Sequence, residues 1–258
     1  MFTRLLIGLD GSPNADEALE QAVMLGRRFK SKLIVAHVKE TSVLGRRTSD
    51  SGALLERAME RVRDAGLAVE TIFKHGDPDT ELAALARDVD TVLVGRRGRS
   101  SRAEAIGKTV SSLIRIAERT VIVCASKPSP MNGCAIAFDG RETAQRALAL
   151  VARFASVTHS TVHIIHATID PAMGTMVVGE AEAMLSLQGV AFVTHIEHGT
   201  PGEAVARVIQ RTQCDALFAG AHVGSGGGGG GGGRHSDVTV SHAEEILGHT
   251  DIPVVIQP

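Results

Sequence analysis

The amino-acid sequence predicts an α/β protein made of two similar open parallel sheets, each with five strands and with helices on both faces. Along the chain, short apolar runs alternate with helical patterns, which is typical of parallel strands joined by right-handed crossovers. The whole series of runs then occurs a second time. The 258 residues are therefore expected to hold two copies of one unit. A unit of about 130 residues is an ordinary domain size.

The internal repeat is visible in landmarks that return in the same order. The paired positions, with their separations, are Asp10 and Asp139 (129), His37 and His166 (129), Pro78 and Pro201 (123), Gly95 and Gly220 (125), and Val121 and Val254 (133). Such regular spacing is the signature of a duplicated unit. We therefore place an N-terminal domain at residues 1–128 and a C-terminal domain at residues 129–258.

The composition indicates a globular protein with a local rather than a general charge function. Hydrophobic residues make up 43% of the chain and charged residues 22%, and the net charge is −2. This balance argues against a general nucleic-acid or membrane-surface binder, and no apolar stretch reaches about 18 residues. The three cysteines lack metal-ligand spacing, which suits a reducing compartment, so we expect a cytoplasmic protein.

The elements of the first copy follow in order. A first strand ends at Asp10, and Ser12 and Pro13 supply cap and first-turn residues for a helix in which Asn14 and Glu17 are spaced like a capping pair. The remaining predicted elements are a strand at 33–38, a mobile polar loop at 41–50, a helix at 54–65, a strand at 67–73, a helix at 80–87, a strand at 91–94, a helix at 108–118 and a strand at 121–124.

The glycine-rich stretch after the fourth strand is the main candidate site. Gly95 and Gly98 lack side chains where the backbone turns, four arginines lie nearby (Arg96, Arg97, Arg99 and Arg102), and a helix begins near Gly107. Exposed amide donors, positive charge and a helix N-terminus together favour an anion, most of all a phosphate. An ordinary turn with solvated arginines explains the same spacing equally well.

Asp10 is the second part of the candidate site. In open α/β sheets ligands bind beyond the carboxyl ends of the strands, where the connection changes direction. Asp10 closes the first strand and Gly95 closes the fourth, so both face one cleft if these strands are neighbours. The carboxylate could then accept hydrogen bonds from a ribose or a base amino group, or hold a metal through water. A role for Asp10 as a cap or turn residue stays open.

These residues together resemble the universal stress protein family, as a tandem two-domain member. The resemblance rests on Asp10-Gly11-Ser12, His37-Val38, Gly76-Asp77-Pro78 and Gly95-x2-Gly98. Nucleotide-binding members of that family carry G-x2-G-x9-G-[S/T]. Here eight residues separate Gly98 from Gly107, and Lys108 stands before Thr109.

The resemblance implies Rossmann-like, HUP-type domains related by a pseudo-twofold axis, often paired through their last strands. It also implies a stress-response regulator that binds an adenine nucleotide, ATP with or without Mg²⁺, in the N-terminal domain, with at most weak ATP hydrolysis. Adenine is expected near the Val38 backbone and Asp10, and phosphate near loop amides. The implied site residues are Gly8, Leu9, Asp10, Ser12, Val38, Val94, Gly95, Arg96, Gly98, Gly107, Lys108 and Thr109.

The second copy departs from this pattern. Arg141 replaces the serine after Asp139-Gly140, and Val240 stands where the family has a glycine before Ser241. The run of eight glycines at 226–233 has no use in a folded α/β unit and indicates an engineered linker or a placeholder. We expect a degenerate C-terminal site in a domain that serves dimer-like packing.

Two other functions are weighed against nucleotide binding. The shorter spacing and Lys108 favour a nucleotide-independent interaction module whose glycine loop is only a turn. An enzyme that adenylates a substrate would need a Ser/Gly-rich phosphate loop after the first strand, which is absent. A P-loop is excluded because Arg102 stands where its first glycine belongs. A homodimer and an unidentified protein partner remain open.

The histidines are not expected to act in catalysis or to bind a metal. His37 and His166 recur at one place in the repeat and are expected to pack at strand ends. His195 with His198, and His235 with His242, lack acidic or cysteine partners at ligand spacing. We assign no catalytic residue.

Overall fold

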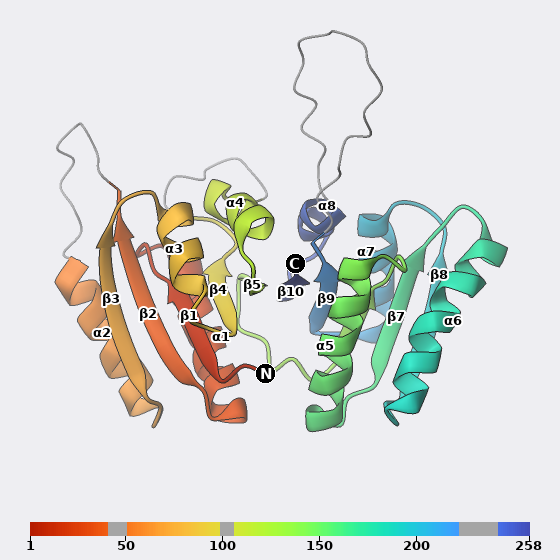
Figure 1. Ribbon diagram of the computed structural model, residues 1–258, viewed down its shortest axis with the longest axis horizontal. Coiled ribbons are helices and arrows are strands. Elements are labelled where there is room, and N and C mark those ends of the chain that lie inside the picture. The colour runs from red at the N-terminus through yellow and green to blue at the C-terminus, as the bar shows by residue number, and fades with distance from the viewer. Residues whose placement is uncertain (41–50, 99–105, 222–241) are drawn as a thin grey trace, which may run out of the picture.

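The structure is a computed structural model and describes residues 1–40, 51–98, 106–221 and 242–258 (Figure 1). Its N-terminal half contains β1 (Arg4–Gly8), α1 (Pro13–Phe29), β2 (Lys32–Lys39), α2 (Ser51–Asp64), β3 (Val69–His75), α3 (Pro78–Ala86), β4 (Thr91–Gly95), α4 (Lys108–Ile116) and β5 (Thr120–Cys124). Its C-terminal half contains β6 (Cys134–Ala137), α5 (Glu142–Thr158), β7 (Val162–Ala167), α6 (Pro171–Leu187), β8 (Phe192–Glu197), α7 (Pro201–Thr212), β9 (Ala216–Gly220), α8 (His242–His249) and β10 (Val254–Gln257).

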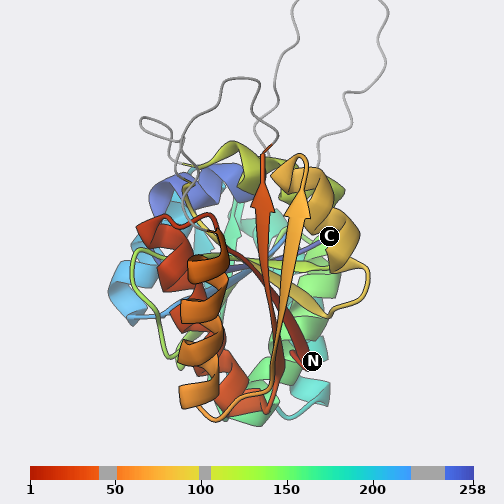
Figure 2. The same cartoon turned by 90° about the vertical axis from the view of Figure 1, so that its left-hand side faces the viewer.

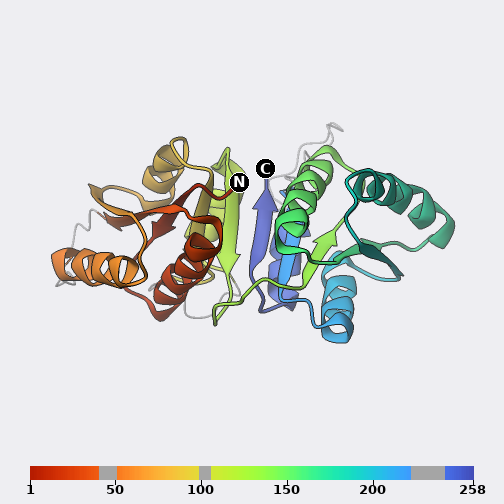
Figure 3. The same cartoon turned by 90° about the horizontal axis from the view of Figure 1, so that it is seen from below.

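The predicted fold is confirmed, and the two sheets are continuous. The strand order is β3-β2-β1-β4-β5-β10-β9-β6-β7-β8, so the second half repeats the order of the first in reverse. Pairing is parallel within each half, whereas β5 and β10 are antiparallel, with Val123 opposite Val254 and Val121 opposite Ile256. Figure 3 shows these two strands side by side at the centre of the molecule. The duplication therefore produces one ten-stranded sheet.

Helices cover both faces of this sheet. The helices belong to two buried clusters. One cluster contains residues of α1, α2, α5 and α6, and the other contains residues of α3, α4, α7 and α8. Figure 2 shows α1 and α2 on one side of the N-terminal strands and α3 on the other. A strand between two helical layers is buried on both faces, which explains the uninterrupted apolar runs of β1 and β4.

The start of α1 differs from the predicted capping pair. Ser12 is the N-cap, and its hydroxyl accepts a hydrogen bond from the Ala15 amide at 3.2 Å. Pro13 follows in the first turn, where its missing N–H costs nothing. The prediction that Asn14 and Glu17 form the capping pair is therefore wrong. A helix capped by Asn14 would begin at Ala15, whereas α1 begins two residues earlier, at Pro13.

Aromatic side chains from both halves pack together beneath the sheet. Phe154 of α5 lies 6.1 Å from Phe2 and 5.6 Å from Phe29, measured between ring centroids. On its other side it lies 5.5 Å from Phe218 of β9. Phe2, Phe154 and Phe218 are fully buried, so one apolar core spans the two halves.

The connection between β5 and β6 is held against α1 by a buried amide. Gln21 Nε2 donates to the Ser129 carbonyl at 2.9 Å, and the Ser129 amide donates to Gln21 Oε1 at 2.7 Å. Arg28 also donates to the carbonyls of Pro130 and Met131 at 2.9 and 3.2 Å. The domain boundary placed between residues 128 and 129 falls within this connection and stays a prediction.

Element boundaries shift by a few residues from the predictions, for example β3, which runs to His75 rather than to residue 73. Several predictions lie outside the described residues: the loop at 41–50, Arg99, Arg102, the glycine run at 226–233 and Ser241.

We expect Gln21→Ala to lower the free energy of unfolding by about 2–4 kcal/mol, because it leaves the amide and carbonyl of Ser129 buried without partners. Urea denaturation followed by circular dichroism measures this. Gln210→Ala, at an exposed position of α7, is the matched control and should stay within about 0.5 kcal/mol. Equal effects of the two substitutions would contradict this account of the connection.

Candidate functional site

The candidate site lies at the carboxyl end of β1, where the strand order of the N-terminal sheet changes direction. β1 pairs with β2 on one side and with β4 on the other, with Leu6 opposite Ile34 and Val92. The chain passes from β1 to β2 in one direction and reaches β4 in the other, which is the arrangement that opens a crevice at the carboxyl ends. The prediction that the first and fourth strands are neighbours is confirmed.

Asp10 and Gly98 lie close together at this edge of the sheet. A Cβ atom placed on Gly98 would lie 2.9 Å from Oδ2 of Asp10. The other carboxylate oxygen, Oδ1, accepts the Ser12 amide at 2.9 Å. Asp10 thus serves as a turn residue through one oxygen while the other lies beside the glycine bend. Asp10 can therefore be a turn residue and still present one carboxylate oxygen toward the glycine bend.

His37 supports the backbone that presents Asp10. Its Nδ1 lies 2.7 Å from the Leu9 carbonyl oxygen, which can only accept, so Nδ1 carries the proton. The Leu9 amide donates to Ala36 at 2.8 Å, so the residue before Asp10 is tied to β2 at both backbone atoms. His166 makes the same contact with Phe138 at 2.7 Å. The prediction that both histidines pack at strand ends is confirmed.

Gly95 is required by helix packing. A Cβ atom at this position would lie 2.5 Å from the backbone carbon and oxygen of Asn14, at the start of α1. Only a residue without a side chain permits this approach of β4 to α1. The glycine is therefore explained without a ligand.

The loop after Gly95 is closed by a backbone hydrogen bond. The Gly107 amide donates to the Arg96 carbonyl oxygen at 2.9 Å. The prediction that the Gly107 amide is a phosphate donor is therefore wrong in this structure, because the protein itself uses that N–H. Gly107 is nevertheless the N-cap of α4, and it supplies no side chain to satisfy the first-turn amides.

Arg96 does not join a cationic cluster at the site. Its side chain is only 7% exposed and donates to the carbonyl oxygens of Leu247, Thr250 and Ile252, which lie at the end of α8 and just beyond it. Burial lowers the pKa of the guanidinium. The expectation that this side chain attracts an anion is wrong, because the folded chain directs it into the C-terminal half. Arg97 is exposed.

Lys108 lies near two carboxylates that the motif did not include. Its charge is a minor influence that favours the carboxylate forms of Asp77 and Asp79 at the start of α3, where hydrogen bonds have the largest effect on the pKa values. The hydrogen bond with Asp79 nevertheless raises the pKa of Asp77 overall. Hydrogen bonds from Asp77 and Ser112 lower the pKa of Asp79. A mixed-charge group therefore borders the start of α4.

Apolar residues of the predicted site line the sheet edge. Leu9, Val38 and Val94 are buried, and Gly8 packs so closely that a Cβ atom there would lie 2.9 Å from Leu82 and 3.7 Å from Val94. Ser12 is also buried at the α1 cap. The structure thus brings Gly8, Val94, Asp10 and Gly98 to one edge, whereas the Arg96 side chain leaves it.

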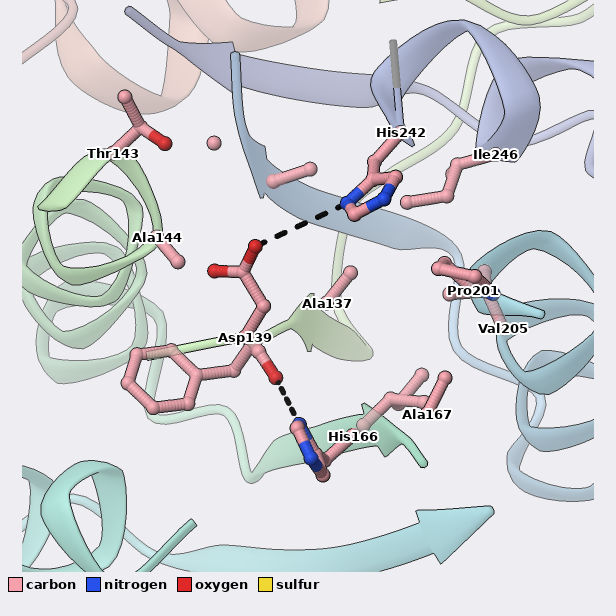
Figure 4. Close-up of a pocket in the computed structure, with 14 residues that line it drawn as sticks. Ala137, Asp139, Thr143, Ala144, His166, Ala167, Pro201, Val205, His242 and Ile246 are labelled. Atoms are coloured by element: carbon pink, nitrogen blue, oxygen red, sulfur yellow. Dashed lines mark hydrogen bonds and ion pairs between the residues drawn. The ribbon is translucent and has the colours of Figure 1, made fainter. Parts of the chain in front are cut away.

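A pocket occupies the equivalent place in the C-terminal half. Its cavity volume is about 100 Å³, and Ala137, Ile165, Ala167, Val205 and Ile246 form much of its apolar wall (Figure 4). Its polar end is unlike the N-terminal one.

Asp139 at that polar end has basic neighbours. Its Oδ1 accepts the Arg141 amide at 3.0 Å, and its Oδ2 lies 3.6 Å from Arg141 Nη1 and 3.9 Å from His242 Nδ1. His242, Pro201 and Val205 also line this pocket, which the sequence alone did not predict. The repeat contained the signal, since Pro201 answers Pro78.

Another contact missed from the sequence joins His163 and His195. Nδ1 of His163 lies 2.9 Å from Nε2 of His195, between neighbouring strands β7 and β8. Burial lowers the pKa of both imidazoles, and the charges of His163 and Arg211 lower that of His195 further. Among the described residues, no group of three or more His, Cys, Asp or Glu side chains is placed to hold a metal ion.

We expect Gly95→Ala to lower the free energy of unfolding by about 2–4 kcal/mol, because its Cβ meets backbone atoms that cannot rotate away. Gly98→Ala should cost less, since the Asp10 carboxylate can move. Gly179→Ala in α6, where a Cβ meets nothing within 4 Å, is the control and should be neutral or stabilising. Chemical denaturation of the three variants tests this order, and a Gly95→Ala protein as stable as wild type would refute the packing argument.

The His163–His195 pair predicts a loss of stability in mild acid. Since both pKa values are lowered on folding, the unfolded chain binds protons first as the pH falls through about 6.5, and this favours unfolding. Wild type should therefore lose more stability between pH 7.5 and 5.5 than a His163→Gln/His195→Gln variant, measured by urea titration at each pH. His198→Gln, at an exposed position, should keep the wild-type dependence. Identical pH dependence in the double variant would contradict the expectation.

No helix in the described part of the chain combines the length and apolar character needed to cross a bilayer.

Comparison with known proteins agrees with the repeat and the fold. Residues 1–125 match the model of the universal stress protein family. Universal stress protein Slr1230 of Synechocystis sp. is 26% identical over 255 residues, which cover 97% of this chain and 82% of that protein. Universal stress protein YxiE of Bacillus subtilis is 27% identical over 133 residues, covering 43% of this chain and 90% of that protein.

A solved structure shows the same architecture over the full length. The crystal structure of a universal stress protein from Archaeoglobus fulgidus has a TM-score of 0.77 at 20% identity, and the match covers 100% of this chain and 98% of that one. Residues 1–125 therefore form a domain of the universal stress protein family, and the chain as a whole has the two-domain fold of that solved structure.

Proposed function

We propose that the N-terminal domain binds an adenine nucleotide, with ATP as the ligand, and that the protein acts as a regulator in stress responses. The observation that carries the proposal is the position of the Asp10 carboxylate, whose Oδ2 lies beside Gly98 at the carboxyl ends of β1 and β4. A carboxylate at a switch point can accept hydrogen bonds from a ribose or a base amino group.

The two ends of the proposed site differ in character. Val38 and Val94 are buried apolar residues near the ends of β2 and β4, and the proposed contact with the purine ring is the Val38 backbone. At the other end, the N-cap of α4 is Gly107, which has no capping side chain, and Lys108 adds positive charge in the same turn. Such a helix start suits a phosphate. The amides of Gly95, Arg96, Gly98 and Lys108 are the proposed phosphate donors, with Thr109 beside them.

Asp77 and Asp79 give the proposal a place for Mg²⁺. Both carboxylates lie near Lys108, whose charge acts on them. Magnesium prefers oxygen ligands and is usually held by one or two carboxylates together with substrate phosphates and water. In this proposal Asp77 and Asp79 would be the residues that hold Mg²⁺, which would offset the charge of the phosphates. Hydrolysis would be weak at most, since no general base is assigned.

The tandem arrangement limits how the protein can associate further. The last strands of the two halves, β5 and β10, already pair with each other. A homodimer of this chain would therefore have to use a different surface from the last-strand contact implied by the family resemblance. We propose a cytoplasmic location, domains at 1–128 and 129–258, and an unidentified protein partner that responds to nucleotide binding.

Isothermal titration calorimetry with ATP and with adenosine, each with and without Mg²⁺, tests the site. Asp10→Asn keeps an acceptor for the Ser12 amide but removes the charge, and should weaken both ligands by about tenfold or more, because hydrogen bonds to charged groups contribute about 1.5–3 kcal/mol. Lys108→Gln should weaken ATP but leave adenosine almost unchanged. Asp139→Asn, the equivalent change in the C-terminal half, is the matched control and should bind like wild type.

The competing function is a nucleotide-independent interaction module. The observation in its favour is the Gly107 amide, which the protein already uses within the loop. Two results together would establish this alternative and exclude the nucleotide: no nucleotide released when the purified protein is denatured, and no ATP binding at millimolar concentration.

A further inference from the structure

Arg96 belongs to both halves of the molecule. Its backbone carbonyl accepts the Gly107 amide at 2.9 Å and so closes the loop of the proposed nucleotide site. Its guanidinium donates to the carbonyl oxygens of Leu247, Thr250 and Ile252 in the C-terminal half. One residue therefore fixes the loop in the N-terminal domain and the end of α8 in the C-terminal domain.

The contact between the Arg96 guanidinium and these carbonyl oxygens resists displacement for physical reasons. The acceptors lie at the C-terminal end of α8 and just beyond, where unpaired carbonyls carry partial negative charge and favour a cation. Burial lowers the pKa of Arg96, and the charge of Asp251 opposes that shift. Arg96 Nε is buried without a hydrogen-bond partner among the described residues. A buried cation held by several fixed carbonyls cannot be shifted without exposing or breaking these bonds.

Helix α8 also forms part of the C-terminal pocket. His242 in its first turn and Ile246 one turn later line that pocket, and His242 Nδ1 lies 3.9 Å from the Asp139 carboxylate (Figure 4). Arg115 of α4 adds a further contact between the N-terminal half and α8, to Glu244 at 3.2 Å. The loop of one domain and the pocket wall of the other are thus attached to opposite ends of one short helix.

Among the described residues, the equivalent position of the C-terminal half makes no such contact. Because Gly220 answers Gly95, the residue equivalent to Arg96 is Ala221, whose amide donates to Gln257 and whose side chain is a methyl group. No long side chain at that position can hold the end of α4. The contact therefore makes the two halves unequal at the place where they are otherwise related by the repeat.

We propose that Arg96 is a positioning residue that couples the loop of the N-terminal nucleotide site to α8, and through α8 to the pocket of the C-terminal domain. The proposal rests on the proposed function for its ligand, but the mechanical link itself is a property of the ligand-free protein. If ATP fixes the Gly95 to Gly98 backbone, it also restrains Arg96 and therefore α8. If ATP changes the affinity of a second ligand that binds at α8, that ligand must change the affinity for ATP by the same factor.

Hydrogen–deuterium exchange of the full chain tests the link in two arms. In the ligand-free arm, Arg96→Met should speed exchange in peptides covering residues 94–98 and 107–112 and in peptides covering 242–252. Arg97→Met, at an exposed position of the same loop, should match wild type. Arg96→Lys keeps the charge but not the forked donors, and should fall between wild type and Arg96→Met. Arg96→Lys also replaces Arg96→Met if the latter does not fold.

In the second arm, saturating ATP should slow exchange at 242–252 about fivefold or more in wild type and in Arg97→Met, but not in Arg96→Met. A purely structural contact would not produce this ligand-dependent difference. ATP binding that leaves 242–252 unchanged in wild type would overturn the proposal, as would loosening of α8 alone in ligand-free Arg96→Met. Failure of ATP to bind any of the proteins would reject the proposed function instead, and the ligand-free arm would still decide whether Arg96 joins loop and helix.

Discussion

The antiparallel pairing of β5 with β10 is the constraint on which the rest of the structure depends. Each half alone would end in a strand with unpaired backbone groups, which is a site for aggregation. Pairing the two last strands satisfies those groups and produces one continuous sheet. It also places Phe154 against Phe2 and Phe29, and it brings α8 within reach of Arg96. The shared core and the contacts between the halves all follow from this pairing.

The fold and half of the candidate site could be predicted from the sequence because both depend on local patterns. Apolar periodicity defines the strands and helices, and the repeat doubles the number of observations for each. The approach of Asp10 to Gly98 follows from the rule that parallel strands present their carboxyl ends at one edge. The direction of the Arg96 side chain could not be predicted, because it depends on where the second half docks. The His163–His195 contact likewise depends on the register between β7 and β8.

The repeated glycines show why a motif must be separated into packing and binding parts. A Cβ atom on Gly220 would lie 2.6 Å from the backbone of Thr143, as one on Gly95 would lie 2.5 Å from Asn14. Both glycines are needed so that a strand can approach the helix beside it, in a domain with or without a ligand. The argument for a nucleotide therefore cannot rest on Gly95. It rests on Gly98, because the atom nearest to a Cβ placed on this glycine is a carboxylate oxygen of Asp10.

The covalent connection between β5 and β6, held by Gln21 and Ser129, affects how the two halves can differ in sequence. In a symmetric dimer of identical subunits every substitution appears twice, once on each side of the axis, so a contact that runs in one direction cannot arise. Here Gln21 and Ser129 fasten two covalently joined copies, and each copy always meets the same neighbour. Mutations can then accumulate independently on the two sides, and an arginine can be retained in one copy while an alanine suffices in the other. Joining the two copies in one polypeptide thus removes the requirement that both sides of the molecule carry the same residues.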